Sequence, residues 1–231
     1  MIGIICAMDT EVNGYIEEMK NKKTETVSGY AFTRGLLNGV DAVVVMCGIG
    51  KVNAAICTQT MIMKYNPEYI INSGIGGGIT SDTEIGDIVI GESVIQHDMD
   101  TTAFGDPKGL LDLPNGNRTE LYCSEKLITC AQSICQRLGI RCHTGKIVTG
   151  DQFITKKQKR IELSEEFGAI ICEMEGGSVG QTCYRADIPF IIIRAVSDNI
   201  EKSNHMDYLE FKKQCSELSA KIVIALLSEV K

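Results

Sequence analysis

The sequence lacks the residue spacings that build metal sites and disulfide frameworks. It has three histidines, four prolines and no tryptophan among 231 residues, and its ten cysteines form no Cys-x-x-Cys pair. The histidines have no metal-ligand spacing among themselves or with the cysteines, so we predict no metal and no cofactor. Most cysteines lie in apolar runs, where a free thiol packs as a small hydrophobe. We therefore expect reduced, structural cysteines in a reducing cytoplasm.

Positive charge and long apolar runs are also scarce. Lys and Arg number 23 against 30 Asp and Glu, which gives a formal net charge of -7. This charge disfavours nucleic acid and anionic membranes as partners, because both would repel an acidic surface. No apolar run approaches the roughly 18 residues of a membrane span, and Met1–Met8 has no basic region typical of a signal peptide. We expect a cytoplasmic protein that acts on small molecules.

Short apolar runs recur along a chain that is 44% hydrophobic, with no repeat or linker between them. Rich in Ile and Val and without polar alternation, they indicate strands that are covered on both faces. The expected strands are Ile2–Cys6, Val43–Met46, Tyr69–Ile71, Ile88–Ile90, Ile147–Val148, Ala169–Cys172 and Phe190–Val196. A hairpin turn at Asn38-Gly39 would make the sheet mixed. We predict a single domain over residues 1–231.

Helical patterns lie between these strands. The expected helices are Val52–Tyr65, Thr119–Leu138, Gly176–Tyr184 and Tyr208–Val230. The last places apolar residues at alternating spacings of four and three, which forms one stripe against the core. Gly139 stands where a left-handed C-cap would end the second helix. The sequence therefore predicts an α/β fold with a mixed central sheet surrounded by helices.

Polar groups follow four of the expected strands, where ligands bind in sheets of this kind. Glu11 follows the first strand, a glycine cluster follows Tyr69–Ile71, Glu173 and Glu175 follow Ala169–Cys172, and Asp198 follows Phe190–Ile193 together with Arg194. Each carboxylate alone also fits a solvated helix start or N-cap. Because carboxylates follow three separate strands, we expect them to meet in one acidic cleft.

The glycine cluster Gly74-Ile75-Gly76-Gly77-Gly78 does not match the dinucleotide-binding fingerprint, because its third glycine would fall at Ile79. Gly48-Ile49-Gly50-Lys51 likewise lacks the upstream glycine of a phosphate-binding P-loop, since that position is Val45. We expect tight turns at both places, or a close approach of the backbone to a ligand.

Seven motifs together resemble the 5′-methylthioadenosine/S-adenosylhomocysteine nucleosidases of the nucleoside phosphorylase superfamily, and they occur in family order over nearly the whole chain. They are Ala7–Val12, Gly48–Ala55, Gly86–Val89, Thr102–Gly105, Gly150–Ile154, Glu173–Glu175 and Arg194–Asp198. The resemblance implies a nucleoside phosphorylase-like fold and a homodimer in which the partner subunit completes each pocket. It also implies hydrolysis of the N-glycosidic bond of methylthioadenosine, adenosylhomocysteine and 5′-deoxyadenosine, in methionine salvage.

The resemblance assigns catalytic roles to matching positions. Glu11 would activate the attacking water, and Arg194 would help to place it. Glu175 would bind the ribose hydroxyls, with Met174 packed on the sugar. Asp198 would be the general acid that protonates N7 of adenine. The chemistry needs these residue types, because loss of adenine leaves a cation-like sugar and a negatively charged base.

The resemblance also implies a set of substrate-binding residues. Phe153 would stack on the purine, and the Ile154 backbone would read its edge. The remaining residues expected at the site are Ala7, Met8, Ile49, Ile75, Gly77, Glu173 and Tyr208, with Phe104 and Pro114 supplied by the partner subunit. Ile49, Tyr208, Phe104 and Pro114 would line a pocket for the 5′-alkylthio group, which favours apolar surroundings.

One position departs from the family pattern. Ile75 stands where the family usually has a serine that holds the acid Asp198. A side-chain hydroxyl is therefore missing, and backbone N–H groups, Ser73 or Ser197 remain as replacements. The departure bears on how Asp198 is oriented, and the three acids themselves are unaffected.

Three alternatives remain open. A phosphorylase would use phosphate in place of water, although Asp9 and Glu11 at the first strand end would repel phosphate. A non-catalytic nucleoside-binding protein would not need both a base and a proton donor. An aminodeoxyfutalosine hydrolase would share the core acids, and the sequence separates it poorly from the nucleosidases.

Overall fold

The computed structural model describes residues 1–201 and 205–230, and over these residues the chain forms ten strands, six α-helices and one short 3-10 helix. The strands are β1 (Ile2–Cys6), β2 (Lys20–Val27), β3 (Tyr30–Leu37), β4 (Val40–Met46), β5 (Tyr69–Gly78), β6 (Ile88–Gln96), β7 (Leu121–Tyr122), β8 (Cys142–Thr149), β9 (Ala169–Glu173) and β10 (Phe190–Asp198). The helices are α1 (Asp9–Glu18), α2 (Lys51–Tyr65), η1 (Thr102–Phe104), α3 (Glu125–Leu138), α4 (Lys157–Phe167), α5 (Gly176–Arg185) and α6 (His205–Leu227).

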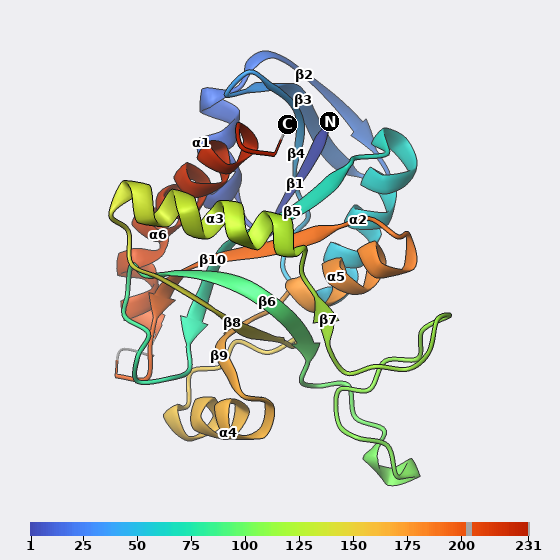
Figure 1. Ribbon diagram of the computed structural model, residues 1–231, viewed down its shortest axis with the longest axis vertical. Coiled ribbons are helices and arrows are strands. Elements are labelled where there is room, and N and C mark those ends of the chain that lie inside the picture. Colours follow the sequence, from blue (N-terminus) through green and yellow to red (C-terminus); the bar gives the residue numbers. More distant parts are fainter. Residues whose placement is uncertain (202–204, 231) are drawn as a thin grey trace.

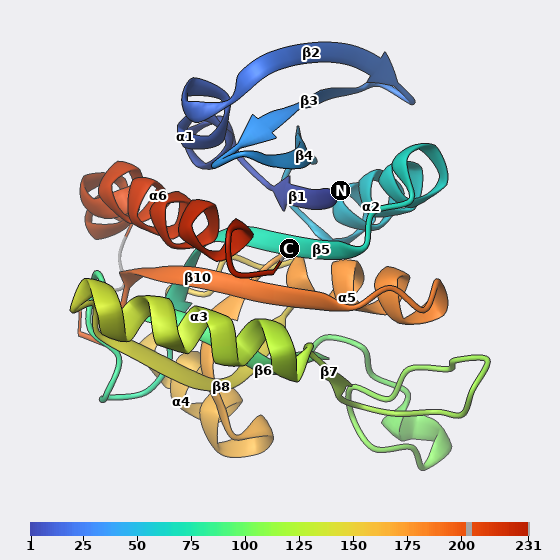
Figure 2. The same ribbon diagram turned by 45° about the horizontal axis from the view of Figure 1, so that its top comes forward.

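The sheet closes on itself through β5. Strand β5 pairs parallel with β10, β10 pairs antiparallel with β6, and β6 and β8 pair parallel. The circuit closes from β8 to β9 in parallel and from β9 back to β5 antiparallel. Strands β1, β4, β3 and β2 extend from the edge of β5 opposite β10, where β1 pairs with the first residues of β5, as Figures 1 and 2 show. The mixed sheet predicted from the sequence is confirmed.

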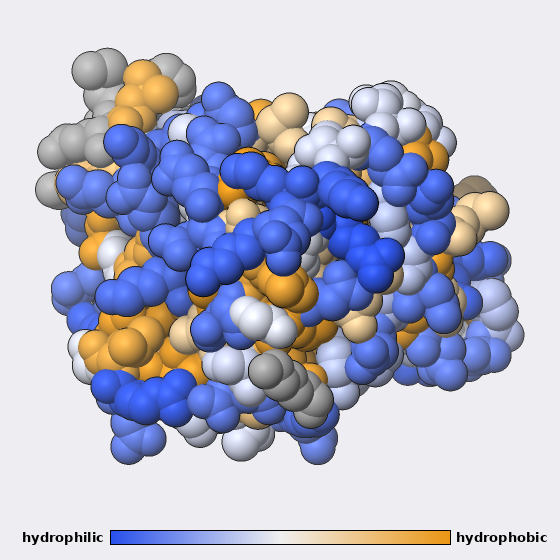
Figure 3. All heavy atoms as spheres, turned by 90° about the horizontal axis from the view of Figure 1, so that it is seen from above, coloured by the Kyte–Doolittle hydropathy of each residue, from blue (hydrophilic) through white to orange (hydrophobic). Residues whose placement is uncertain are grey.

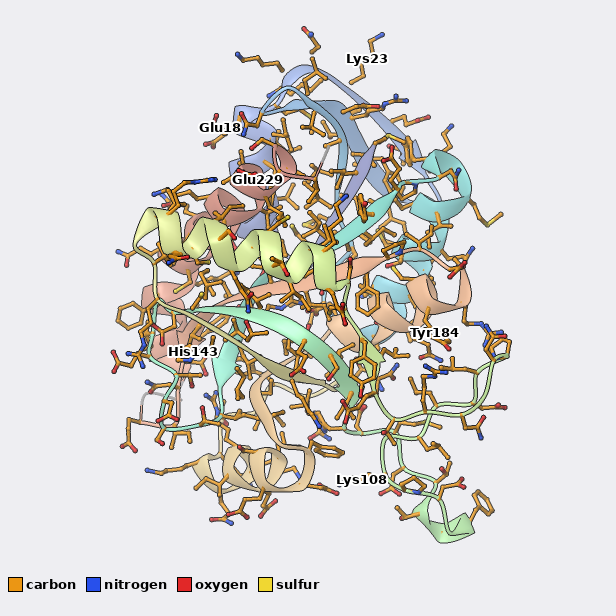
Figure 4. The ribbon with its side chains drawn as sticks, in the orientation of Figure 1. Glu18, Lys23, Lys108, His143, Tyr184 and Glu229 are labelled. Carbon is orange, nitrogen blue, oxygen red and sulfur yellow. The ribbon has the colours of Figure 1, made fainter. Side chains whose placement is uncertain are left out.

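Burial explains why the central strands have continuous apolar sequences. Every residue of β1 and of β10 is buried, because helices and neighbouring strands cover both faces. Strand β2 is the exception, since it lies at the sheet edge and all but one of its residues are exposed. Lysines on such an edge discourage pairing with other chains, and Lys23 extends away from the molecule in Figure 4. The end of the molecule that carries β2 is mainly hydrophilic (Figure 3).

The helices surround the sheet in two groups. Helix α6 packs on β5 and β10 and also contacts α1 and α3. Helix α2 packs against α5, and α5 contacts β6 and β8 (Figure 2). In the part of the chain described, no helix combines the length and apolar character needed to cross a membrane.

Two predicted turns agree with the structure. Asn38 and Gly39 have φ values of 47° and 74°, which suits the tight hairpin between β3 and β4. Gly139 ends α3 in the left-handed conformation, with φ of 65°.

Two expectations of local structure need correction. Of the two interpretations of the glycine cluster, the turn is wrong, because Gly74, Gly76, Gly77 and Gly78 all lie within β5 and none has a positive φ. Its glycines instead let neighbouring side chains approach the strand. The helix expected from Thr119 begins only at Glu125, because Leu121–Tyr122 pairs with β6 as β7.

Candidate active site

A cavity of about 330 Å³ opens where β1, β5, β9 and β10 end. Its lining residues are Ala7, Met8, Glu11, Ile49, Ile75, Gly76, Gly77, Phe153, Cys172, Glu173, Met174, Glu175, Ser197, Asp198 and Tyr208. The described part of this lining holds four carboxylates and no lysine or arginine. The strand ends identified in the sequence thus deliver their acids to one cavity.

Glu11 is buried and rigidly held, although it lies in the first turn of α1, where a carboxylate is usually solvated. Its Oε2 accepts hydrogen bonds from the N–H groups of Ala7 and Met8 at 2.9 and 3.0 Å. Its Oε1 accepts one from the Ile75 N–H at 3.0 Å. A side chain at Gly74 would overlap this carboxylate, so β5 must present a glycine there. These contacts hold the Glu11 carboxylate at the wall of the cavity.

Burial raises the pKa of Glu11 above its ordinary value. Arg194 and the three backbone N–H groups act in the opposite direction without cancelling the effect of burial. A carboxylate with a raised pKa accepts a proton near neutral pH more readily than an ordinary glutamate does. Glu11 therefore has the environment of a general base.

Arg194 lies inside β10 and behind the carboxylates, not after the strand as the sequence had indicated. It is 1% exposed, and its Nη2 donates to Glu173 Oε2 at 2.5 Å and to Asn72 Oδ1 at 2.6 Å. The same nitrogen is 3.9 Å from Glu175 Oε2. The structure thus places Arg194 as a buried counter-charge for Glu173 and Glu175.

Glu175 occupies the N-cap position of α5. Its Oε1 accepts a hydrogen bond from the Gly50 N–H at 2.9 Å, and Gly50 has a φ of 98°, a conformation that favours glycine. Burial, followed by the neighbouring Glu173 carboxylate, raises the pKa of Glu175 to about 8. At neutral pH this side chain can therefore donate as well as accept a hydrogen bond.

Asp198 is the last residue of β10 and is 1% exposed. Ser197 Oγ donates to its Oδ1 at 2.7 Å, and Arg160 of α4 forms an ion pair with its Oδ2. Ser73 has other partners, because the Tyr15 hydroxyl donates to its Oγ at 2.6 Å. Of the two serines that the sequence offered as substitutes at Ile75, Ser197 is the one that contacts Asp198.

The cavity has an apolar end. Phe153 and Tyr208 meet edge to face, with ring centroids 5.2 Å apart, and Ile49 is about half exposed beside them. Phe104 is 87% exposed, and neither Phe104 nor Pro114 belongs to the described lining of this cavity.

Ile154 lies beside the cavity rather than in its lining. It borders a small adjoining space of about 30 Å³, together with Arg160 and Asp198. Its carbonyl oxygen accepts hydrogen bonds from Arg160, so this stretch of backbone is fixed next to Asp198.

Sequence reasoning missed Arg160 and Thr149. Arg160 stands in the charged run Lys156–Arg160, which carries no signal of burial. Thr149 donates to Glu173 and accepts from the Gly177 N–H at 2.7 Å, at the end of β8. The available signal for Thr149 was its position directly before the matched motif Gly150–Ile154.

Comparison with known proteins identifies the class to which this fold and cavity belong. The sequence profile of the phosphorylase superfamily matches residues 1–228. A 5′-methylthioadenosine/S-adenosylhomocysteine nucleosidase of Shewanella sediminis is 40% identical over 232 residues, covering 99% of each chain. One from Bacillus cereus is 36% identical over 233 residues, covering 100% of this chain and 99% of the relative.

Solved structures agree with these sequence matches. A Helicobacter pylori 5′-methylthioadenosine/S-adenosylhomocysteine nucleosidase superimposes with a TM-score of 0.93 at 30% identity, covering 99% of this chain and 98% of the other. A futalosine hydrolase of the same organism also gives 0.93, at 29% identity, covering 99% and 97%. The chain belongs to the 5′-methylthioadenosine/S-adenosylhomocysteine nucleosidase family of the phosphorylase superfamily.

Proposed function

We propose that this protein hydrolyses the N-glycosidic bond of 5′-methylthioadenosine and S-adenosylhomocysteine, and of 5′-deoxyadenosine, releasing adenine and the 5-substituted ribose. The observation that carries the proposal is the meeting of Glu11, Glu175 and Asp198 around one cavity with an apolar end. The names of relatives at 36 to 40% identity over the full chain support the same reaction. Its place would be methionine salvage in the cytoplasm.

Each acid has a separate duty in this reaction. Water attacks C1′ of the ribose while Glu11 accepts its proton, and the bond from C1′ to N9 breaks. The electron pair of that bond moves onto adenine, whose N7 takes a proton from Asp198. Glu175 exchanges hydrogen bonds with the ribose hydroxyls, and the Glu11 carboxylate faces the positive charge that develops on the sugar.

The apolar end of the cavity fits the rest of the substrate. Phe153 stacks on adenine, and Met174 packs on the sugar. The 5′-alkylthio group lies against Ile49 and Tyr208, which border the mouth. A neutral sulfur substituent gains from these apolar contacts, because its transfer from water is favourable.

Cavity charge favours water over phosphate as the nucleophile. Four carboxylates and no basic side chain occur among the described lining residues, so a phosphate anion would be repelled. Arg194 lies behind Glu173 and Glu175, and these acids already neutralise it.

A second candidate is hydrolysis of aminodeoxyfutalosine. It is favoured by the futalosine hydrolase of Helicobacter pylori, whose structure matches this fold as well as that of the nucleosidase does. The same three acids would serve, and only the group at the 5′ position would differ.

We also propose a homodimer in which the partner subunit completes the pocket. Support comes from apolar side chains left exposed at the cavity mouth and on α2: Ile49 is 53% exposed, Val52 69% and Ile56 49%. Phe104 and Pro114, which line no part of the described cavity of their own chain, would reach the 5′ pocket of the neighbour. Exposed apolar patches of this kind are typical of subunit interfaces.

Adenine release from purified protein tests the proposal. Methylthioadenosine, adenosylhomocysteine, 5′-deoxyadenosine and aminodeoxyfutalosine would be compared with and without phosphate. We expect release from the thio-nucleosides at a rate that phosphate leaves unchanged. Strict dependence on phosphate would establish a phosphorylase, and release only from aminodeoxyfutalosine would establish the second candidate.

A further inference from the structure

Arg160 is the most deeply buried cation near the site that none of the roles above uses. It comes from α4, is 1% exposed and forms an ion pair with Asp198 through Nη2. Its Nε and Nη2 also donate to the Ile154 carbonyl oxygen at 3.0 and 2.7 Å, and its Nη1 donates to the Gly78 carbonyl oxygen at 3.1 Å. The guanidinium group is therefore fixed in position by three separate segments of the chain.

Strand β5 makes room for this guanidinium. A Cβ atom at Gly77 would lie 3.0 to 3.1 Å from the terminal atoms of Arg160, so the group lies directly against the Gly77 backbone. Gly77 has no positive φ, and its conformation is open to other residues. A side chain at position 77 would therefore crowd the guanidinium group and force it to shift by a few tenths of an ångström.

Arg160 supplies Asp198 with the side-chain hydrogen-bond donor that Ile75 lacks. Ile75 has no side-chain donor, whereas Arg160 contacts Oδ2 and Ser197 contacts Oδ1 at 2.7 Å. Each carboxyl oxygen has two lone-pair sites, so these two contacts fix the plane of the carboxyl and still leave a site that a proton for the substrate can occupy.

We propose that Arg160 is the positioning residue that orients Asp198 for proton transfer to the purine, in place of a hydroxyl at position 75. The inference rests on the proposed function. When Asp198 has given its proton to N7, the adjacent guanidinium stabilises the carboxylate that remains. Through the Ile154 carbonyl, the same group fixes the backbone that follows Phe153. Arg160 thus fixes the position of Asp198 relative to Phe153, the residue proposed to stack on the purine.

Arg160→Gln and Arg160→Lys test this role in the full-length protein. For Arg160→Gln, kcat for adenine release should fall by about 100-fold, the effect of misplacing a reacting group by about 1 Å. KM should change far less than kcat. Arg160→Lys restores a cation and should recover part of the rate. Lys159→Gln, at a partly exposed neighbour whose ammonium group pairs with Glu162, is the matched control and should leave the rate unchanged.

A substrate with a different leaving group shows whether Arg160→Gln misplaces the acid Asp198 or disturbs the whole site. A 4-nitrophenyl 5-methylthioriboside releases a stable phenolate, so its cleavage needs no proton from Asp198. Arg160→Gln should keep most of its activity on this substrate while losing it on methylthioadenosine. A merely structural role for Arg160 would lower both rates equally.

A double-mutant cycle gives an independent readout. Once Asp198→Asn has removed the acid, adding Arg160→Gln should cause little further loss of adenine release, because residues that act as a unit are not additive. If Arg160→Gln does not fold, Arg160→Lys and Gly77→Ala, which pushes on the guanidinium, are measured on both substrates instead.

Equal losses on both leaving groups, or additive losses in the cycle, would overturn the positioning role while the wild-type activity still stands. A wild-type protein that releases no adenine would overturn the proposed function itself, and the role of Arg160 with it.

Discussion

Replacement of Glu11 by glutamine is the sharpest perturbation of the proposed chemistry, because it removes the base and keeps the shape. Three backbone N–H groups hold the carboxylate, two on Oε2 and one on Oε1. In the variant, the amide NH2 group must face at least one of these donors. The less costly orientation turns it toward Ile75 and leaves a single N–H unpaired.

The substitution affects folding stability and the reaction rate, and these two quantities are measured separately. One unpaired buried donor costs about 1 to 3 kcal/mol of folding stability. Loss of a general base lowers kcat by about 10²- to 10⁴-fold. That range corresponds to about 2.7 to 5.4 kcal/mol on the activation barrier. The variant should therefore remain folded and bind nucleoside while releasing adenine very slowly.

Adenine release would be followed by chromatography, nucleoside binding by calorimetry and stability by thermal denaturation. Glu17→Gln, at an exposed position on the same helix, is the matched control and should change none of the three. Adenine release by Glu11→Gln within a factor of about two of the wild-type rate would refute the assignment of Glu11 as the base.

Three further predictions follow from the site and its surface. Gly74→Ala should abolish most adenine release, because the added methyl group would overlap the Glu11 carboxylate; a steady-state assay on the folded variant measures this. The pKa of Glu175 is raised to about 8 from an ordinary value of about 4.3, so the folded state binds more protons than the unfolded state between these pH values. Stability should therefore fall as pH rises from about 5 to 8, and Glu175→Gln should flatten this dependence in thermal denaturation; an unchanged slope would contradict the raised pKa. Val52→Glu combined with Ile56→Glu should shift the protein from dimer to monomer in light scattering and lower its activity, whereas a wild-type protein that is already monomeric would refute the proposed interface.

The sequence predicted the central strands, because each contains an uninterrupted apolar run. Strands β1 and β10 are buried throughout, so their Ile- and Val-rich runs were readable without a structure. Strand β2 was missed because it lies at the sheet edge and is rich in lysine. Helix α4 buries only Arg160 and Leu163 and therefore has no apolar stripe to detect.

Glycine misled the prediction for β5. A cluster of glycines usually marks a turn, but here the strand continues through Gly78. Glu11 and Arg160 approach the strand so closely that side chains at Gly74 and Gly77 would meet them. The need for small residues at these positions arises from side chains elsewhere in the chain, so it could not be predicted from the sequence of β5 alone.

The candidate site was predictable where it follows strand ends. Glu11, Glu175 and Asp198 lie around one cavity because the ends of β1, β9 and β10 converge there. The groups that hold these acids were harder to find. Arg160 reaches Asp198 across 38 residues of sequence, from a helix whose pattern gives no sign of burial.

Isotope labelling of the product tests the central claim most directly. Purified protein would be incubated with methylthioadenosine in water enriched in oxygen-18, in the presence of phosphate, and the sugar product examined by mass spectrometry. Hydrolysis predicts free methylthioribose that carries the label on C1, together with an equal amount of adenine. A sugar 1-phosphate, an unlabelled sugar or no adenine at all would contradict the account.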